Sequence, residues 1–395
     1  MKILQIIPSV SMVYGGPSQM VLGLSKALAE QGVTLTILTT DANGDSGQAP
    51  LEVPLDRPVI QDGYEIRYFR CSPFRRYKFS TSLLQWLSSH SYEYDLAHIH
   101  ALFSPVSSFS AAIARHHHLP YILRPLGTLD PADLQKKRSL KQLYAAFLER
   151  PNLAGASALH FTSDQEAKIS ERFGTLTRDI VLPLGVNPVT ANPSARQAIR
   201  EQYGIPGDRP LLLFMSRLDP KKGLDLLIPA LEQLLTEGLD FHFVLAGSNA
   251  QDPDYEQQIR DRIQSSALGE KTAIAGFVSG HDKADLLQAA DLFVLPSYYE
   301  NFGIAVAEAM VAGVPVVISD QVYIWEQIQQ ATAGWVSPCS VDGLVEQLRS
   351  GLMDSAERQR RGENAKAYAL EHYSWGAIAQ QMMQIYQQIL TPHLR

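Results

Sequence analysis

Short apolar segments alternate with helical patterns along nearly the whole chain, and this alternation constrains the fold more than any other feature of the sequence. In the first half, the apolar segments predict strands at residues 2–7, 33–40, 64–70, 95–100, 120–124 and 157–161. After the first of them, Pro17 opens a helix with apolar residues at helical spacing, and Gly32 ends it. Strand–helix alternation of this kind predicts a mostly parallel sheet with helices on both faces.

The second half repeats this pattern without repeating the sequence. We expect its strands at residues 210–216, 241–247, 272–275, 291–296 and 314–319, and its main helices at 222–237, 254–266 and 303–312. Two prolines and a glycine within residues 182–188 mark a linker between the halves. Since 395 residues suffice for two ordinary domains, we expect two doubly wound α/β domains, at residues 1–186 and 187–375. A last helical pattern covers residues 376–395.

The composition excludes several classes of protein. A formal net charge of −7 argues against nucleic acid as the main partner. Cys71 and Cys339 form no CxxC pair, so a disulfide framework is not expected and a reducing cytoplasm is the natural setting. No run of about 18 apolar residues occurs, and the first apolar run ends at Pro8, too early for a signal-peptide core. We therefore expect a cytoplasmic protein without a transmembrane helix.

The segment from Glu300 to Glu308 is the most specific candidate for a ligand site. It follows the predicted strand at 291–296, and Gly303 lies where the loop becomes a helix. The free amides at that helix start, together with the helix dipole, favour an anion near Gly303 and Ile304. Glu308, on the second helical turn, is suited to accept two hydrogen bonds from a ribose diol. The alternative, two solvated surface glutamates, is disfavoured by this placement after an apolar strand.

Arg217 and Lys222 form a second candidate, because both lie in the loop that follows the predicted strand at 210–216. Arginine offers a planar fork of donors and lysine a mobile point charge, so the two can converge on a diphosphate. Such cations would stabilise a diphosphate leaving group as it gains negative charge. A solvated, lysine-rich loop is the alternative.

Two weaker candidates lie in the first half. Gly15 and Gly16 precede the helix at Pro17, and paired glycines let a backbone approach a ligand, although a tight turn alone would also explain them. His98 and His100 share one face of their strand, and His100, near its carboxyl end, could bind a sugar hydroxyl or simply pack. Neither GxGxxG nor GxxxxGK[ST] occurs, which opposes a dinucleotide dehydrogenase and a P-loop NTPase.

Two other patterns have competing explanations. Asp252-Pro253-Asp254 has the DxD spacing of some metal sites, but it begins a predicted helix, so we expect a capping role and no metal. Residues 135–150 predict an amphipathic helix that either lies on an anionic membrane surface or packs its apolar side on the core. Its basic residues are Lys136, Lys137, Arg138 and Lys141, and Arg75-Arg76-Tyr77-Lys78 could extend that surface. Its apolar side consists of Leu140, Leu143, Tyr144 and Phe147.

Taken together, these motifs resemble the large retaining glycosyltransferase family 4, which has the GT-B fold of two Rossmann-like domains facing each other across a cleft. The resemblance is ordered along nearly the whole chain, through the segments GG, DLAHIH, PLGVN, SRLDPKKG, LAGS, GFVSG and ENFGIAVAE. Glu300 and Glu308 occupy the two glutamate places of the family's E-x7-E element. Tyr373-Ser374-Trp375 resembles the point where the last helix of that fold crosses back to the first domain.

The resemblance implies a set of site residues. Its catalytic residues would be His100 and Glu300, and its donor-binding residues Gly15, Gly16, Arg217, Lys222, Gly247, Phe277, Val278, Asn301, Phe302, Gly303, Ile304 and Glu308. Within this set, Arg217 and Lys222 would bind the donor diphosphate and Glu308 the ribose. His100 would lie near the donor sugar, and Phe277 and Val278 near the base.

The resemblance also implies the reaction. A hexose would pass from a nucleotide sugar, with UDP-glucose favoured, to a sugar hydroxyl of a soluble or lipid-linked glycan, with retained anomeric configuration and without a metal or other cofactor. Arg124–Pro131 and the basic helix are similar to a subgroup that builds bacterial exopolysaccharides, although Leu126 stands where an arginine is common. A nucleotide-sugar epimerase, a pyridoxal-dependent phosphorylase and a non-catalytic two-lobed sugar-binding protein remain as alternatives.

Overall fold

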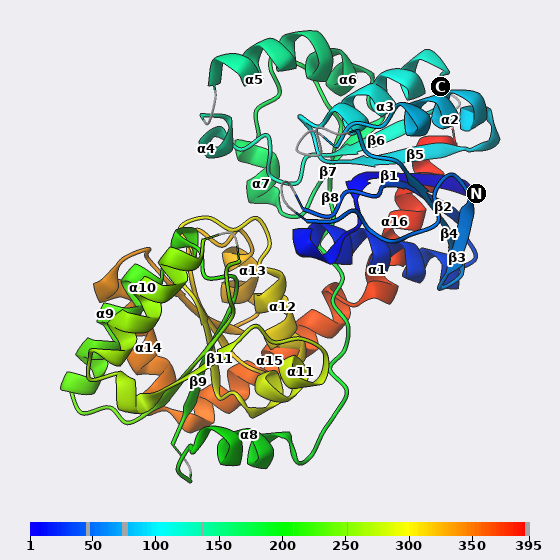
Figure 1. Ribbon diagram of the computed structural model, residues 1–395. Helices are drawn as coiled ribbons and strands as arrows, with labels where there is room; N and C mark the ends of the chain where they lie inside the picture. The colour runs from blue at the N-terminus through cyan, green and yellow to red at the C-terminus, as the bar shows by residue number, and fades with distance from the viewer. Residues whose placement is uncertain (45–47, 73–77, 136–137, 208, 251, 392–395) are drawn as a thin grey trace. The chain divides into compact units, whose positions relative to one another are not determined.

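The chain divides into two compact units in the computed structural model (Figure 1). The first unit consists of Met1–Gly185 and Trp375–Arg395, and the second of Val186–Ser374. The structure describes residues 1–44, 48–72, 78–135, 138–207, 209–250 and 252–391. No helix in these ranges is both long enough and apolar enough to cross a bilayer.

The first unit is built on an eight-stranded sheet with the strand order β3-β4-β2-β1-β5-β6-β7-β8. Its strands are β1 (Lys2–Ser9), β2 (Thr34–Thr40), β3 (Pro58–Gln61), β4 (Tyr64–Phe69), β5 (Leu96–His100), β6 (Tyr121–Arg124), β7 (Ala158–Phe161) and β8 (Asp179–Val181). All neighbouring strands are parallel except β3, which pairs antiparallel with β4 at the edge. The predicted mostly parallel sheet is therefore confirmed.

Helices cover both faces of this sheet, as parallel strands require. They are α1 (Gly16–Glu30), α2 (Thr81–His90), α3 (Pro105–His116), α4 (Pro131–Leu134), α5 (Arg138–Tyr144), α6 (Arg150–Gly155), α7 (Asp164–Ile169) and α16 (Trp375–Leu390). Helices α1 and α16 pack together, and α2 and α3 form a second layer with α6. A π-helical turn at Ala145–Glu149 joins α5 to α6.

The second unit has a six-stranded sheet in which every strand pair is parallel, with the order β11-β10-β9-β12-β13-β14. Its strands are β9 (Leu211–Met215), β10 (His242–Ala246), β11 (Thr272–Gly276), β12 (Leu292–Leu295), β13 (Val316–Ser319) and β14 (Gly334–Ser337). Its helices are α8 (Ala195–Tyr203), α9 (Leu224–Thr236), α10 (Pro253–Gln264), α11 (Gly280–Ala289), α12 (Ile304–Val311), α13 (Trp325–Gln330), α14 (Val341–Met353) and α15 (Ser355–His372). The second predicted α/β sheet is confirmed.

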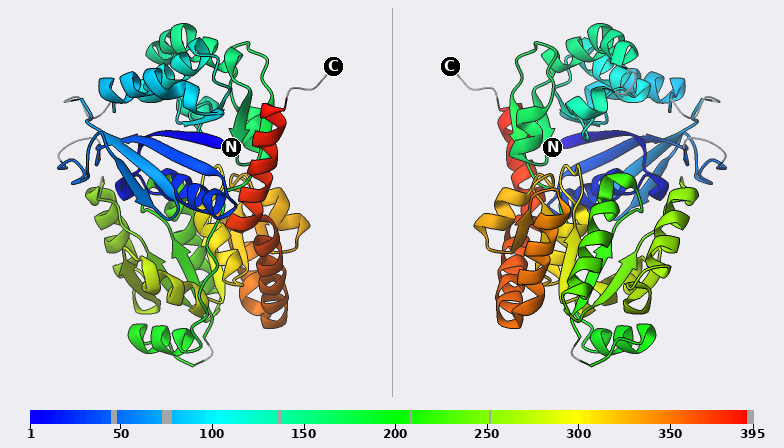
Figure 2. Two further views of the ribbon diagram at one scale, coloured as in Figure 1. Left: turned by 90° about the vertical axis from the view of Figure 1, so that its right-hand side faces the viewer. Right: turned by 90° about the vertical axis from the view of Figure 1, so that its left-hand side faces the viewer.

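Helix α16 returns the end of the chain to the first unit. Figure 2 shows it beside the amino-terminal strand in both views. The ring of Trp375 lies between Gly23 of α1 and Gly185, and a Cβ added at either glycine would approach that ring to 2.3 or 2.2 Å. Further along α16, the buried Tyr386 accepts a hydrogen bond from Gln5 of β1 at 3.1 Å. Two glycines and a buried polar contact thus hold the last helix on the first sheet.

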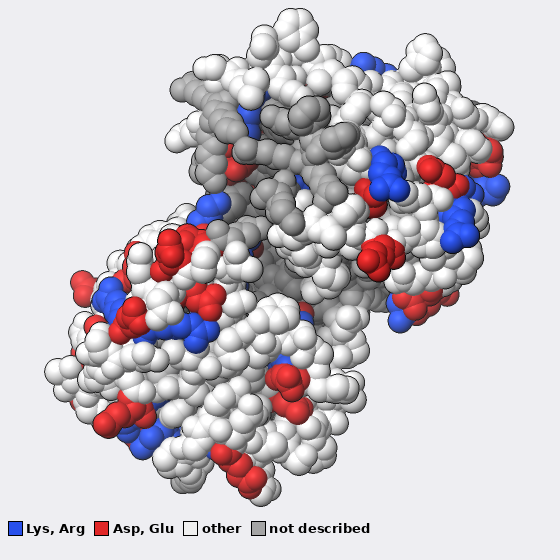
Figure 3. Space-filling view, viewed as in Figure 1, with Lys and Arg blue, Asp and Glu red and all other residues white. Residues whose placement is uncertain are grey.

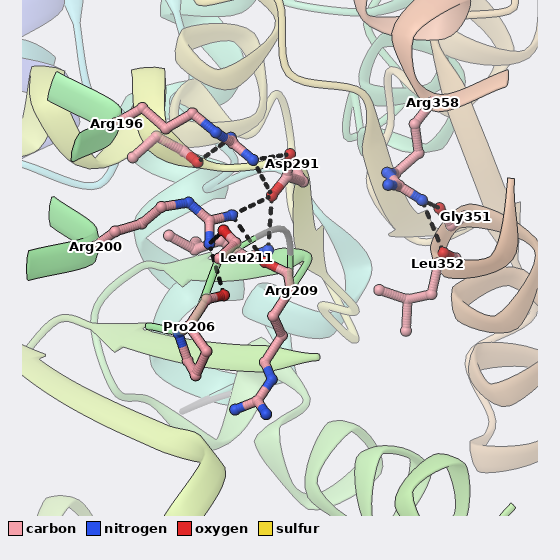
Figure 4. Close-up of polar contacts among 11 residues, drawn as sticks. Arg196, Arg200, Pro206, Arg209, Leu211, Asp291, Gly351, Leu352 and Arg358 are labelled. Carbon is pink, nitrogen blue, oxygen red and sulfur yellow. Dashed lines mark hydrogen bonds and ion pairs between the residues drawn. The ribbon is translucent and has the colours of Figure 1, made fainter. Parts of the chain in front are cut away.

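Asp291 ties α8 to the amino edge of the second sheet (Figure 4). Its carboxylate accepts hydrogen bonds from Arg196 Nη2 at 2.9 Å, from Arg200 Nη2 at 3.4 Å and from the amide of Leu211 at 2.8 Å. Because Leu211 begins β9 and Asp291 directly precedes β12, one side chain joins two central strands and a surface helix.

Replacing Asp291 with asparagine should lower the free energy of unfolding of the second unit by about 2 kcal/mol, because two guanidinium groups lose their anionic partner. Urea unfolding followed by tryptophan fluorescence measures this change. Asp254→Asn, at an exposed position in the same unit, is the matched control and should change stability by only a few tenths of a kcal/mol. Equal effects of the two substitutions would contradict the anchoring role of Asp291.

Candidate functional site

The candidate residues of the second unit gather at the carboxyl edge of its sheet. Because all six strands are parallel, the loops after β9, β10, β11 and β12 leave the sheet at the same edge. Arg217 and Lys222 follow β9, Gly247 follows β10, Phe277 and Val278 follow β11, and the segment from Glu300 to Glu308 follows β12. The fold therefore brings together residues that are far apart in the sequence.

Lys222 and Glu300 form the first of two lysine–glutamate pairs at this edge. The Nζ atom of Lys222 donates a hydrogen bond to Oε2 of Glu300, and both side chains are largely buried. The two loops also meet through their backbones, because the amide of Tyr298 donates to the carbonyl of Lys221 at 2.8 Å. Gly223, with φ +72°, permits this approach, since a Cβ there would lie 2.1 Å from the carbonyl oxygen of Pro296.

Lys283 and Glu308 form the second pair, with Nζ 2.6 Å from Oε1. Both side chains are partly buried, Lys283 on α11 and Glu308 on α12. Glu308 is among the site residues predicted from the sequence, whereas Lys283 is not. The available signal was the position of Lys283 five residues after Val278, on the helix that follows β11, because that helix starts at the same sheet edge.

The start of α12 supplies backbone donors next to Glu300. Gly303 has φ +76° and caps the helix with no side-chain hydrogen bond, which leaves the first amides of α12 for an anion. Phe302 is buried, with its ring edge-on to Tyr373 at a centroid distance of 5.1 Å. Its side chain therefore belongs to the core.

Arg217 is an exposed cation at this edge. Its side chain is 54% exposed and forms an ion pair with Asp219 at 3.4 Å. Gly247, with φ +144°, lies so close to the Arg217 loop that a Cβ there would lie 1.9 Å from the carbonyl oxygen of Ser216. Phe277 is exposed, and Val278 beside it is half-buried. The edge thus combines cations, carboxylates and exposed aromatic rings, among them those of Phe277 and Tyr298.

The remaining predicted site residues belong to the first unit. Gly15, with φ +67°, is the N-cap of α1, and Gly16 is the first residue of that helix. A Cβ added at Gly15 would meet nothing within 4 Å, so the positive φ, rather than lack of space, favours glycine there. His100 is fully buried at the end of β5, where its Nε2 lies 2.6 Å from Oε1 of Gln5.

Asp252 caps α10, as predicted, because its side chain accepts a hydrogen bond from the amide of Tyr255 at 3.2 Å. Among the described residues, no group of three or more His, Cys, Asp or Glu side chains could hold a metal ion. The capping hydrogen bond explains the position of Asp252 in the DxD spacing.

The helical segment at residues 135–150 does not pack its whole apolar side on the core, as one of its two interpretations requires. Leu140, Leu143 and Phe147 are 64%, 59% and 74% exposed, so the core-packed interpretation is wrong for these three side chains. Figure 3 shows white atoms of uncharged residues over much of the described surface near α5. Lys141 forms an ion pair with Asp133 at 2.7 Å. Lys136 and Lys137, like residues 75–77 of the other basic segment, lie outside the described residues.

The three histidines buried in the first unit predict how stability depends on pH. Burial, followed by the charge of Arg124, lowers the pKa of His160 from its ordinary 6.5 to about 3. Burial also holds the pKa values of His98 and His100 well below 6.5. The native state therefore stays neutral at these sites below pH 6.5, where the unfolded chain takes up protons.

The contribution of these neutral histidines to stability is complete above pH 6.5 and is lost as the pH falls below that value. The expected loss is about 1.4 kcal/mol per pH unit for each histidine. Urea unfolding between pH 7 and pH 5 measures the slope. His160→Gln, whose amide can still donate to the Leu182 carbonyl, should reduce the slope of stability against pH by the contribution of one histidine. An unchanged slope would contradict the assignment of a neutral, buried His160 in the native state.

Two protein families match this chain, one in each unit. The family described as glycosyl transferases group 1 matches residues 195–368, and the glycosyl transferase 4-like domain matches residues 15–185. An uncharacterized glycosyltransferase of Methanocaldococcus jannaschii is 34% identical over 207 residues. The alignment covers 51% of this chain and 52% of that relative, so this chain spans about half the length of the relative. A D-inositol 3-phosphate glycosyltransferase of Xylanimonas cellulosilytica is 27% identical, and the alignment covers 95% of this chain and 92% of that one.

Solved structures share the fold over nearly the whole chain. Sucrose-phosphate synthase from Thermosynechococcus elongatus has a TM-score of 0.77 and 21% identity, with 98% of this chain and 99% of that chain covered. HepE of Anabaena, in complex with UDP and glucose, has a TM-score of 0.74 and 20% identity, with 98% and 100% covered. HepE was also solved with UDP-glucose. At sequence identities of 20–21%, the similarity to these structures shows the fold alone.

Proposed function

Because this chain belongs to the group 1 glycosyl transferases, with the GT-B fold and a GT4-type amino-terminal domain, we propose that it transfers a hexose from a UDP-sugar, with UDP-glucose favoured, to a glycan hydroxyl with retention of anomeric configuration. The observation that carries this proposal is the pair of lysine–glutamate contacts at one sheet edge, next to an uncapped helix start. The complex of HepE with UDP-glucose supports the choice of donor.

In this proposal, Lys222 and Arg217 bind the donor diphosphate. Breaking the bond between the sugar C1 and the diphosphate leaves negative charge on the phosphate oxygens, and nearby cations stabilise it. Lys222 is held in place by Glu300, so a bound phosphate would share or replace that partner. A released Glu300 carboxylate could then accept hydrogen bonds from hydroxyls of the donor sugar. Two protein cations and the amides of α12 would supply the charge that a metal supplies elsewhere.

Glu308 binds the ribose in this proposal. Lys283 donates a hydrogen bond to Oε1 of Glu308, and no described residue donates one to Oε2 of the same carboxylate. The lysine offsets the cost of keeping a partly buried carboxylate ionised, while the remaining lone pairs suit the two hydroxyls of a ribose. Lys283 is thus a positioning residue for Glu308.

Retention would follow from a front-face reaction. The acceptor oxygen forms a bond to C1 on the side from which the diphosphate leaves, and its proton passes to a phosphate oxygen. Glu300 and Glu308 are each engaged by a lysine, and neither is assigned as a nucleophile. A covalent glycosyl-enzyme adduct trapped during turnover would contradict this route.

Lys222→Ala should lower kcat by on the order of 100-fold, because it removes a cation that acts on the leaving diphosphate. Transfer of labelled glucose from UDP-glucose to glycan acceptors measures the effect, with and without EDTA. Lys271→Ala is the matched control, since it breaks another lysine–carboxylate pair, with Asp240, at the opposite edge of the same sheet, and should leave kcat unchanged.

Three results of this assay would contradict the proposal. They are equal activity of the two lysine variants, loss of transfer on adding EDTA, and conversion of a UDP-sugar into its epimer without any acceptor.

We further propose that the helical segment at residues 138–149 contacts an anionic membrane surface at its cytoplasmic face, where the acceptor would be a lipid-linked glycan of an exopolysaccharide or related polymer. The exposed Leu140, Leu143 and Phe147 supply an apolar contact surface, and the sequence places Lys136 and Lys137 directly before this segment. Exposed apolar side chains beside clustered lysines match the two components of an anionic bilayer surface.

Replacing Leu140, Leu143 and Phe147 with glutamine together should abolish sedimentation with vesicles that contain phosphatidylglycerol. The wild-type chain should bind these vesicles more strongly than neutral phosphatidylcholine vesicles. Leu176→Gln is the control, because Leu176 is 98% exposed elsewhere in the first unit and its replacement should not change binding. Equal binding by the triple variant and the wild type would contradict the proposed contact.

A further inference from the structure

A row of buried polar side chains crosses the first sheet beneath α16. Gln5 lies on β1, His98 and His100 on β5, His160 on β7 and Tyr386 on α16. All five side chains are buried, and hydrogen bonds of 2.6 to 3.3 Å join them into one chain. A continuous polar chain of this kind within a sheet–helix interface constrains the position of every proton in it.

The row of hydrogen bonds ends at the backbone carbonyl of Leu182, and this end determines the donor and acceptor of every bond in the row. The carbonyl oxygen of Leu182 can only accept, so Nε2 of His160, 3.0 Å away, carries a hydrogen. A neutral His160 then accepts at Nδ1, and Nε2 of His98, 3.3 Å away, must be the donor. The Nδ1 atom of His98 in turn accepts, and the hydroxyl of Tyr386 donates to it at 2.9 Å.

Gln5 links Tyr386 to His100 and fixes the position of the hydrogen on His100. The hydroxyl oxygen of Tyr386 accepts from Nε2 of Gln5 at 3.1 Å, so the amide oxygen of Gln5 faces His100. That oxygen can only accept, and Nε2 of His100, 2.6 Å away, therefore carries the hydrogen. His100 is left with an unprotonated Nδ1, which is buried and has no hydrogen-bond partner in the described part of the chain.

The surroundings keep the three histidines neutral, as this scheme requires. Burial, the neighbouring histidines and the Arg124 guanidinium on β6 lower the pKa values of His98 and His100. Arg124 is buried, and its Nε also lacks an acceptor, yet no hydrogen bond joins it to His100. Glu166 on α7 accepts hydrogen bonds from Thr162, and no carboxylate among the described residues forms a hydrogen bond or ion pair with His100.

We propose that Tyr386 and Gln5 are positioning residues that fix His100 as a hydrogen-bond acceptor, so that its free Nδ1 takes a hydroxyl of the sugar and not an anionic oxygen. This inference rests on the proposed function and on the resemblance to glycosyltransferase family 4, which implies that His100 lies near the donor sugar. A phosphate or carboxylate oxygen has no hydrogen to donate to Nδ1, whereas every sugar hydroxyl has one. The last helix of the chain thereby determines what a residue of β5 can bind.

Tyr386→Phe tests the chain at its central link. Without the hydroxyl, Nε2 of Gln5 has no acceptor, and the amide can turn over to present a donor to His100. His100 would then accept at Nε2 and carry its hydrogen on Nδ1. Gln5→Met, which keeps the volume, removes the acceptor that holds the hydrogen on Nε2 of His100, so the Nδ1–H tautomer should become populated beside the Nε2–H tautomer. Tyr64→Phe is the control, because Tyr64 is buried in the same unit and its hydroxyl has no partner in the described residues.

Long-range proton–nitrogen NMR of the full chain labelled with 15N-histidine reads the tautomers directly, whether or not transfer occurs. The expected result is neutral Nε2–H at His98, His100 and His160 in the wild type and in Tyr64→Phe. Tyr386→Phe should show Nδ1–H at His100, and Gln5→Met should show both tautomers there. In the transfer assay, both variants should lower kcat/KM, Tyr386→Phe by about tenfold, with UDP binding unchanged.

Each outcome separates this inference from the proposed function. Nδ1–H or a doubly protonated ring at His100 in the wild type would overturn the inference, as would an unchanged tautomer in both variants. A changed tautomer with unchanged kcat/KM would overturn the role of His100 toward sugar while leaving glycosyl transfer intact. Absence of transfer by the wild type would overturn the proposed function and, with it, the role of His100 toward sugar, and the NMR result would then describe the hydrogen-bond chain alone.

Discussion

The parallel direction of all six strands in the second sheet is the constraint on which the candidate site depends. It brings four loops, separated by up to about ninety residues of sequence, to one edge, where two lysines and two glutamates pair across neighbouring loops and helices. Neither pair could form within a single loop, since Lys222 and Glu300 follow different strands, and Lys283 and Glu308 lie on different helices. The charges are therefore arranged before any ligand arrives, which reduces the reorganisation needed on binding.

The first unit depends on a different interaction, the docking of α16. Trp375 fits between two glycines, and Tyr386 joins a hydrogen-bond chain that reaches the end of β5. A helix more than 280 residues away in sequence thus completes the buried face of the first sheet. Because the polar chain has a single consistent direction, this docking also determines the tautomer of His100.

Much of the fold follows from local pattern, and the exceptions have physical reasons. Buried central strands such as β9 are continuous apolar runs that the sequence shows directly, whereas the edge strands β3 and β8 are short and mostly exposed and lack such a run. Glu300 and Glu308 could be identified because a glycine and an apolar strand surround them. Lys283 was harder to identify, because a lysine on a polar helix has no distinctive neighbours and only its place on the helix after β11 indicates the site. Helical spacing predicted an apolar side at residues 140–147, but the spacing could not show that three of the apolar side chains would be exposed.

The central claim is that the carboxyl edge of the second sheet binds a nucleoside diphosphate. Calorimetric titration of the full chain with UDP, GDP and ADP, each with and without EDTA, tests it most directly, with Arg217→Ala and Glu308→Gln as the variants. The account predicts that UDP binds in the presence of EDTA, that Arg217→Ala weakens binding, and that Glu308→Gln weakens UDP but not 2′,3′-dideoxy-UDP. Absence of binding by all three diphosphates, or equal affinity in both variants and the wild type, would contradict it.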